Sequence, residues 1–193
     1  LMEQTREIIT HTTKQNPLRR FVYTKLLGSP NLIRLLQYPI SVLSRSRITR
    51  LLEQTFDLRK SPFRHLTTSL QLLPNDVPYP QTRPQIYFSG KEKRRSVGLL
   101  IGCIGDVFTS RVKDATIKVL NYLGYDVHTI PQITCCGALA AHSGFGERAR
   151  ELALNVISTI ESSPINFYIS NIAGCGAMLK DYPKLFEGTD HFD

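Results

Sequence analysis

The sequence predicts an α/β fold, in which a small parallel sheet of the Rossmann-like β-α-β-α-β kind is preceded by an α-helical segment. In the second half of the 193-residue chain, short apolar runs of strand length alternate with longer stretches of helical apolar spacing. This alternation favours right-handed crossovers between parallel strands. Residues 1–57 instead give a succession of helical patterns.

The first half is predicted to form four helices, followed by a linker. The predicted helices are Met2–Lys14, Leu18–Leu27, Asn31–Leu43 with an interruption near Pro39, and Ile48–Phe56. Their apolar faces are narrow, so we expect them to pack against another structure. Five prolines and a charged run then indicate a basic linker: Pro62, Pro74, Pro78, Pro80, Pro84 and Lys91–Arg95. The expected organisation is a helical connector or docking segment at 1–58, a linker at 59–95 and an α/β domain at 96–193.

Six elements are predicted in the second half. The strands are Ser96–Gly102, Tyr125–Ile130 and Asn166–Ser170, and the helices are Thr109–Leu123, Glu147–Ile160 and Ala177–Phe186. The first strand is an unbroken apolar run, which is typical of a parallel strand covered on both faces. The first two helices carry an apolar stripe on one side, as expected of helices that cover a sheet.

Charge divides the chain in the same way. The net charge is +8, made of +11 over residues 1–95 and −3 over residues 96–193. The basic half would suit an acidic partner or an anionic lipid, or it is a solvated appendage. No nucleic-acid motif accompanies the charge, so we expect no nucleic-acid partner. No apolar run reaches the roughly 18 residues of a membrane span, and Leu1–Lys14 lacks a signal-peptide core. A cytoplasmic protein is expected, with peripheral attachment to the inner face of a membrane or to a complex left open.

All four cysteines fall in the second half, each after a predicted strand. Cys103 follows the first strand, Cys135 and Cys136 follow the second after a short loop, and Cys175 follows the third. The carboxyl ends of parallel strands meet at one edge of a sheet, where ligand sites assemble. We therefore expect the four thiols to converge.

Four converging thiols indicate a metal centre. Iron–sulfur clusters and zinc both use cysteine thiolates, and buried thiolates are costly unless a cation compensates them. Glycines flank each position, and glycine allows close backbone approach with amides free to bond sulfur: Gly102, Gly137, Gly174 and Gly176. The alternative is that the cysteines are small buried apolar residues. The adjacent pair and the shared edge favour the metal centre.

The cysteine pattern resembles the cysteine-rich CCG domain family. The residues that carry the resemblance are Gly102-Cys103, Cys135-Cys136-Gly137 and Gly174-Cys175-Gly176, within residues 96–190. This domain occurs in the heterodisulfide reductases, in lactate-oxidation proteins and in the iron–sulfur subunit of bacterial glycolate oxidase. The segment Asn171–Tyr182 is most similar to the glycolate oxidase type, and residues 1–95 resemble the helical connector that precedes the domain.

Two features depart from the family pattern. Members of this type usually carry two ferredoxin-like Cys-x-x-Cys-x-x-Cys runs and a second CCG domain. This chain has neither, so we expect it to represent a part of such a protein. The heterodisulfide reductase pattern ends in Cys-x-x-Cys, whereas Met178 stands three residues after Cys175 here. Four thiols favour a [4Fe-4S] cluster or a zinc-like site over the five-cysteine cluster of that enzyme.

The resemblance implies an electron-transfer subunit rather than an enzyme by itself. It implies a flavin-dependent glycolate (2-hydroxy acid) oxidase complex, with flavin-containing subunits and a ferredoxin-like module as partners. A thiol- or disulfide-active subunit like that of heterodisulfide reductase is one alternative, and a structural zinc-binding or metal-free interaction domain is another. The expected cofactor ligands are Cys103, Cys135, Cys136 and Cys175, supported by Gly137 and by His142 as a hydrogen-bond donor or proton shuttle.

Overall fold

A computed structural model describes residues 2–26, 29–45, 85–91, 95–108, 110–130, 133 and 135–189. The predicted helix Ile48–Phe56 and most of the predicted linker 59–95 lie outside these residues. None of the described helices has the length and apolar character needed to cross a membrane.

The described elements alternate between helices and strands in the second half, as predicted. In chain order they are α1 (Met2–Thr12), α2 (Pro17–Phe21), the π-helix η1 (Val22–Leu26), α3 (Pro30–Arg45), β1 (Ile86–Tyr87), β2 (Arg95–Leu100), α6 (Cys103–Phe108), α7 (Ser110–Tyr122), β3 (Tyr125–Thr129), α8 (Ala138–His142), α9 (Gly146–Glu161), β4 (Tyr168–Ser170), α10 (Ala173–Lys180) and α11 (Tyr182–Phe186).

The sheet has the strand order β1-β3-β2-β4. The three predicted strands are parallel, with Val97 opposite Val127 and Leu99 opposite Ile169. The chain leaves central β2 through α7 to reach β3 on one side, then returns through α9 to β4 on the other. The carboxyl end of β2 is therefore the point where the direction of the crossovers reverses. In open α/β sheets this is the edge where ligand sites form.

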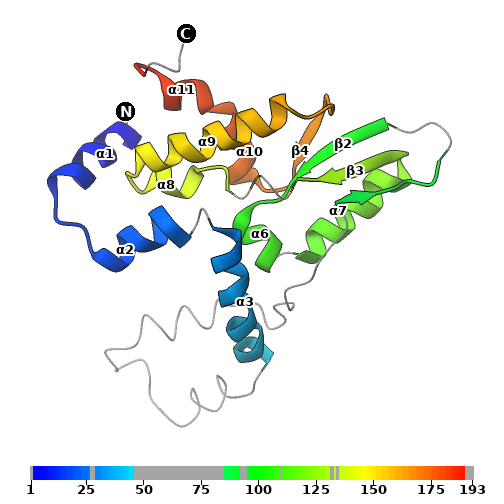
Figure 1. The fold of residues 1–193 in the computed structure, drawn as a ribbon, viewed down its shortest axis with the longest axis horizontal. Helices are drawn as coiled ribbons and strands as arrows, with labels where there is room; N and C mark the ends of the chain where they lie inside the picture. The colour runs from blue at the N-terminus through cyan, green and yellow to red at the C-terminus, as the bar shows by residue number, and fades with distance from the viewer. Residues whose placement is uncertain are drawn as a thin grey trace.

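The sheet is covered on both faces, which explains the unbroken apolar run of β2. Figure 1 shows α7 on one side of the strands and α8 to α11 on the other. Val97, Leu99 and Val127 pack with Ile117 of α7 in one core cluster. Leu100 belongs to the second cluster, which is formed largely by α8, α9, α10 and α11. Successive residues of β2 thus point into different cores, as the two-residue period of a strand requires.

Several elements differ from the sequence predictions. The antiparallel edge strand β1 lies within the predicted linker and pairs Ile86 with His128. Helix α3 runs through Pro39 without the predicted interruption. Pro39 and Leu35, whose carbonyl loses its helical partner, are both exposed, so water can satisfy the lost hydrogen bond. Helix α10 begins at Ala173, four residues before the predicted start, and α6 and α8 are short helices that were not predicted.

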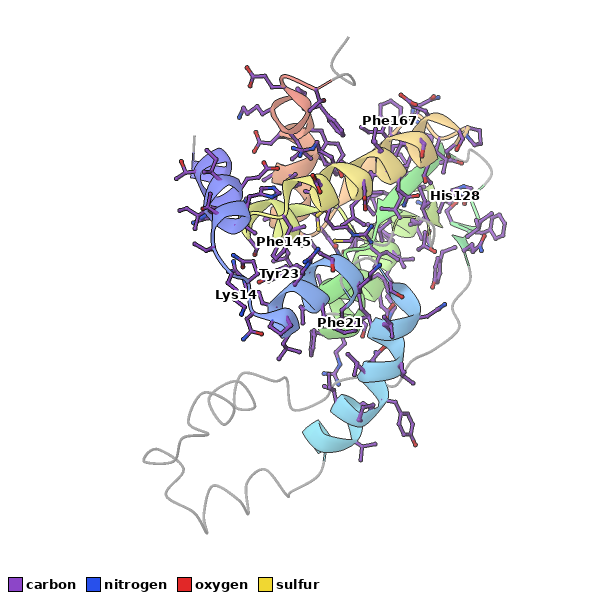
Figure 2. All side chains as sticks on the ribbon, turned by 60° about the vertical axis from the view of Figure 1, so that its left-hand side comes forward. Lys14, Phe21, Tyr23, His128, Phe145 and Phe167 are labelled. Atoms are coloured by element: carbon purple, nitrogen blue, oxygen red, sulfur yellow. The ribbon has the colours of Figure 1, made fainter. Side chains whose placement is uncertain are left out.

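The N-terminal helices pack on the corner between α8 and α9. Arg6 Nη1 donates to the carbonyl of His142 at 3.0 Å, and Arg19 Nη2 donates to that of Ser143 at 3.1 Å. Glu7 pairs with Arg150 of α9 at 3.0 Å. Figure 2 shows Lys14, Tyr23 and Phe145 gathered at this junction. The described part of the predicted docking segment therefore packs on the cysteine-bearing domain of its own chain.

A glycine makes this close packing possible. Gly144 has a φ of +82°, and a Cβ at this position would overlap Thr10 Oγ1 and the carbonyl group of Arg6. The Gly144–Gly146 segment thus leads into α9 and also packs against α1.

Replacing Tyr23 with alanine should loosen the N-terminal helices. The rings of Tyr23 and Phe145 stack with centroids 5.3 Å apart, and such a pair contributes about 0.5–1.5 kcal/mol beyond burial. Trypsin should therefore cleave near Lys14 and Arg19 roughly 3- to 10-fold faster, because the free energy needed to open the N-terminal helices locally is lower. Tyr122→Ala is the matched control, because Tyr122 is 79% exposed at the end of α7. Equal cleavage rates in the two variants would contradict this packing.

Candidate metal centre

The four cysteines lie on three segments that leave the carboxyl ends of the parallel strands. Cys103 is the first residue of α6, directly after β2. Cys135 and Cys136 lie in the connection from β3 to α8. Cys175 lies in the first turn of α10, after β4. The reversal of the crossovers at β2 brings these three segments together.

The thiols contact one another in a chain. Cys103 Sγ lies 3.8 Å from Cys135 Sγ, and Cys135 and Cys136 also share a hydrogen bond, as do Cys136 and Cys175. Cys103 and Cys175, at the two ends of this row of thiols, are half-buried. The central pair, Cys135 and Cys136, is buried, with 3% and 9% of the residue exposed. The predicted convergence of the four side chains is therefore observed. The two central thiols are shielded from water, and the two outer thiols are partly accessible.

Backbone amides at the helix starts point at the sulfur atoms. The Gly137 amide donates to Cys135 Sγ at 3.4 Å. The amides of Ile104 and Ala138 bond the sulfurs of Cys103 and Cys136. Such bonds favour the charged form of a thiol. The amides at the starts of α6 and α8 thus help to stabilise negative charge on three of the four ligand candidates.

At two of the four flanking glycines, a Cβ would come close to other atoms. A Cβ on Gly137, whose φ is +84°, would lie 2.9 Å from the carbonyl oxygen of Ala149. A Cβ on Gly102 would lie 3.1 Å from Cys175 Sγ. At Gly174 and Gly176 nothing lies within 4 Å of the Cβ position, so the close approach expected there does not occur among the residues described.

Hydrogen bonding separates the pKa values of the four thiols. The bonds from Cys135 and Cys175 lower the pKa of Cys136 to about 3, and the bond with Cys135 lowers the pKa of Cys103. The same bonds raise the pKa values of Cys135 and Cys175, and burial raises them further. Hydrogen bonding therefore favours negative charge on Cys136 and Cys103 and retention of the proton on Cys135 and Cys175.

This donor set fits a positively charged metal group. Paired thiolates inside a protein are costly without a compensating cation, and four cysteine sulfurs with amide donors are what iron–sulfur clusters use. In the part of the chain that the structure describes, no three or more His, Cys, Asp or Glu side chains are arranged around a single metal-ion position. The thiols instead contact one another directly.

The structure adds two residues to the surroundings of the site. The Tyr182 hydroxyl donates to the carbonyl oxygen of Cys136 at 3.0 Å. Burial, and then negative charge on the nearby cysteines, raises the pKa of Tyr182, so the phenol keeps its proton. Met178, which stands where a fifth cysteine would be expected, is 4% exposed in the core cluster that contains Cys136. Tyr182 was part of the segment that carried the family resemblance, but no sequence spacing connects it with Cys136.

Replacing Tyr182 with phenylalanine should weaken the fold measurably. The change leaves the carbonyl of buried Cys136 without this donor, which costs about 1–3 kcal/mol. Urea unfolding of the metal-free protein measures the difference. Tyr168→Phe is the control, because the half-buried Tyr168 hydroxyl makes a longer bond of 3.5 Å to Ile160. A smaller loss for Tyr182→Phe than for this control would contradict the assigned role.

His142, which the sequence analysis singled out, and two further basic residues lie around this site or beyond it. His142 is the last residue of α8, with an exposed side chain, and its carbonyl accepts the bond from Arg6. His128 contacts Ser96 Oγ at 3.3 Å between two strands. Lys180 is exposed at the end of α10.

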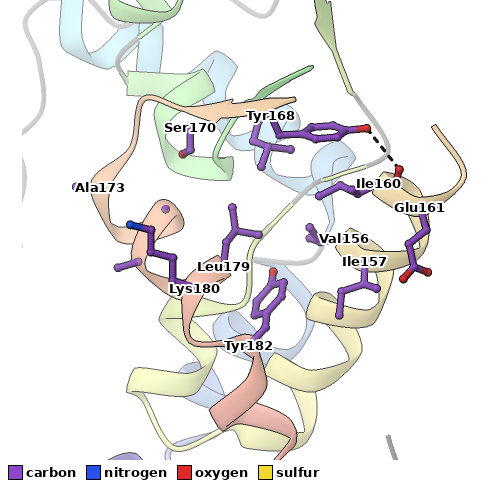
Figure 3. A pocket seen from close by; sticks show the side chains of 13 residues that line it. Val156, Ile157, Ile160, Glu161, Tyr168, Ser170, Ala173, Leu179, Lys180 and Tyr182 are labelled. Atoms are coloured by element: carbon purple, nitrogen blue, oxygen red, sulfur yellow. Dashed lines mark hydrogen bonds between the residues drawn. The ribbon is translucent and has the colours of Figure 1, made fainter. Parts of the chain in front are cut away.

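An open apolar groove lies beside the cysteine site. It has a volume of about 870 Å³ and runs between α9, β4 and α10. Figure 3 shows Val156, Ile157, Leu179, Lys180 and Tyr182 among the residues that line it. Tyr182 therefore belongs both to the groove and to the surroundings of Cys136.

Comparison with known proteins gives consistent matches over the same region. The family model of the cysteine-rich domain CCG matches residues 97–180. A probable glycolate oxidase iron-sulfur subunit of Bacillus subtilis (strain 168) is 31% identical over 97% of this chain and 43% of its own length. Lactate utilization protein A of Exiguobacterium sp. is 33% identical over 48% of this chain and 38% of its own length. Lactate utilization protein A of Macrococcus caseolyticus is 36% identical over 47% of this chain and 36% of its own length.

The chain thus spans less than half the length of these curated relatives. No solved structure matches it.

Proposed function

Because residues 97–180 form a cysteine-rich domain of the CCG family, we propose that the chain is an iron–sulfur electron-transfer module. Cys103, Cys135, Cys136 and Cys175 would hold one cluster. The observation that carries this proposal is the convergence of four thiols, two of them 3.8 Å apart, at the carboxyl ends of three parallel strands. An iron–sulfur cluster supplies one-electron transfer at such a site.

The cluster is proposed to be [4Fe-4S]. Four thiolates are the ligand set of that cluster, and the full sequence contains four cysteines, all of them in this site. Buried Met178 occupies the position of a possible fifth cysteine, which speaks against a disulfide-cleaving role of the heterodisulfide reductase kind. Zinc remains the alternative metal, and analysis of the bound metal distinguishes the two.

The residues around the thiols have three tasks in this proposal. The amides of Gly137, Ile104 and Ala138 donate to sulfur and stabilise its negative charge. The core around Cys135 and Cys136 excludes water from the middle of the site. His142 lies six residues past Cys136 and is proposed to donate a hydrogen bond or carry a proton at the site edge.

The proposed setting is a complex that oxidises a 2-hydroxy acid. Glycolate and lactate, which the names of the relatives contain, both belong to this class. With all four cysteines used in one site, electrons would arrive from flavin-containing subunits through a separate ferredoxin-like module. The reaction on the hydroxy acid would then occur elsewhere. We propose a cytoplasmic location, with contact to the inner face of the membrane made through the complex.

Anaerobic purification followed by iron, sulfide and zinc analysis tests the proposal. About four irons and four sulfides per chain, with an electron paramagnetic resonance signal that changes on reduction by dithionite, would support a [4Fe-4S] module. Zinc alone, or no metal after anaerobic reconstitution with iron and sulfide, would exclude it.

A further inference from the structure

The two cysteines that approach each other most directly come from different strand ends. Cys103 begins α6 and Cys135 lies in the connection after β3, 32 positions further along the chain. Their sulfur atoms are 3.8 Å apart. Since a disulfide has its two sulfurs at about 2.05 Å, small side-chain rotations would bring this pair to bonding distance.

We propose that Cys103 and Cys135 form a reversible disulfide when the metal-free chain meets a small-molecule disulfide, and that this oxidation blocks metal loading. The formation of the bond does not depend on the proposed electron-transfer function. The effect of the disulfide on metal loading does rest on the proposed function, because the block requires that Cys103 and Cys135 serve as metal ligands.

The adjacent cysteines Cys135 and Cys136 are a poor alternative pair. Consecutive Cα atoms joined by a trans peptide are about 3.8 Å apart, below the usual 4.4–6.8 Å range for disulfides. No cis peptide bond occurs among the residues that the structure describes. Cys136 and Cys175 form the remaining rival pair, and the experiment below separates it from Cys103 and Cys135.

Exposure determines the order of the two exchange steps. Cys103 is half-buried and open to reagents, whereas Cys135 is 3% exposed. Cys103 sulfur, as the thiolate, attacks one sulfur of a disulfide RSSR, forming a Cys103–S–S–R mixed disulfide and releasing RS⁻. Cys135 then loses its proton and attacks Cys103 sulfur, which forms the protein disulfide and releases the second RS⁻. The two cysteines are oxidised by two electrons, and RSSR is reduced to two thiols.

The test uses the full chain, stripped of metal by a chelator under anaerobic, reducing conditions and then exposed to oxidised glutathione. We expect free thiols to fall from four to two and the Cys103 and Cys135 peptides to become linked in the mass spectrum. Cys135→Ser should instead stop with one glutathione on Cys103, because the second attacking sulfur is missing. Cys175→Ser, the matched variant at the other accessible end of the site, should still form the Cys103–Cys135 bond.

The outcomes distinguish this inference from the proposed function. A Cys136–Cys175 link, or four thiols remaining in a chain with a native circular dichroism spectrum, would overturn the proposed pair. In a second arm, the oxidised chain should take up iron and sulfide only after dithiothreitol is added. Equal uptake before and after dithiothreitol would overturn the blocking effect. If even the reduced chain takes up no iron, the proposed cluster fails while the disulfide mapping still stands.

Discussion

Replacing Cys136 with serine should reduce bound iron from about four atoms to below about one per chain after anaerobic reconstitution. Cys136 is 9% exposed and shares hydrogen bonds with both Cys135 and Cys175, so it joins the two halves of the site. A serine hydroxyl is a much poorer ligand for iron than a thiolate, and its position in the core leaves no room for water to take over. Iron analysis and the electron paramagnetic resonance signal measure the loss.

Ala153→Ser is the matched control for this variant. Ala153 is 0% exposed in the same core cluster, so the change also introduces a hydroxyl into that core but removes no thiol. Urea unfolding of both metal-free variants compares their folds. Retention of about four irons by Cys136→Ser would contradict ligation by this residue. Equal iron loss in Ala153→Ser would assign the effect to core destabilisation instead.

Replacing Gly137 with alanine should destabilise the metal-free fold by about 2–5 kcal/mol. A left-handed conformation costs a non-glycine residue about 1–2 kcal/mol, and Gly137 has a φ of +84°. The new methyl group would also lie 2.9 Å from the carbonyl oxygen of Ala149, and overpacking typically costs about 1–3 kcal/mol more. Because the Gly137 amide bonds Cys135 Sγ at 3.4 Å, bound iron should fall as well.

Gly188→Ala separates the two contributions. Gly188 has a φ of +76° with nothing within 4 Å of its Cβ position, so only the conformational cost of about 1–2 kcal/mol applies. Urea denaturation of both variants under reducing conditions gives the comparison. Equal destabilisation at the two positions would mean that the contact with α9 contributes nothing to the requirement for glycine at 137.

The sequence predicted the strands and long helices of the second half well because their patterns are local. The apolar run at Ser96–Gly102 became β2, and the stripe at Glu147–Ile160 became α9, each with ends displaced by one or two residues. In both elements the apolar residues are those buried against the rest of the domain. Their spacing along the sequence therefore indicates the type of element directly.

Short elements escaped prediction because packing, not local preference, stabilises them. Strand β1 has two residues and exists through its pairing with β3. Helix α10 starts at Ala173, although Gly174 and Gly176 lower its helix propensity. Met178 of the same helix is buried against the core, so tertiary contacts offset that weakness.

The sequence by itself determined the α/β class and the convergence of its four cysteines, because residues that follow parallel strands must meet at one edge of the sheet. The residues around those cysteines also carried the resemblance to the cysteine-rich domain CCG, whose family model matches residues 97–180. Only the tertiary structure decided that Cys103 and Cys135 approach to 3.8 Å, that Tyr182 supports Cys136, and that the N-terminal helices pack on the α8–α9 corner. These contacts join residues far apart in the chain, and their distances depend on strand order and helix packing, which local sequence patterns do not encode.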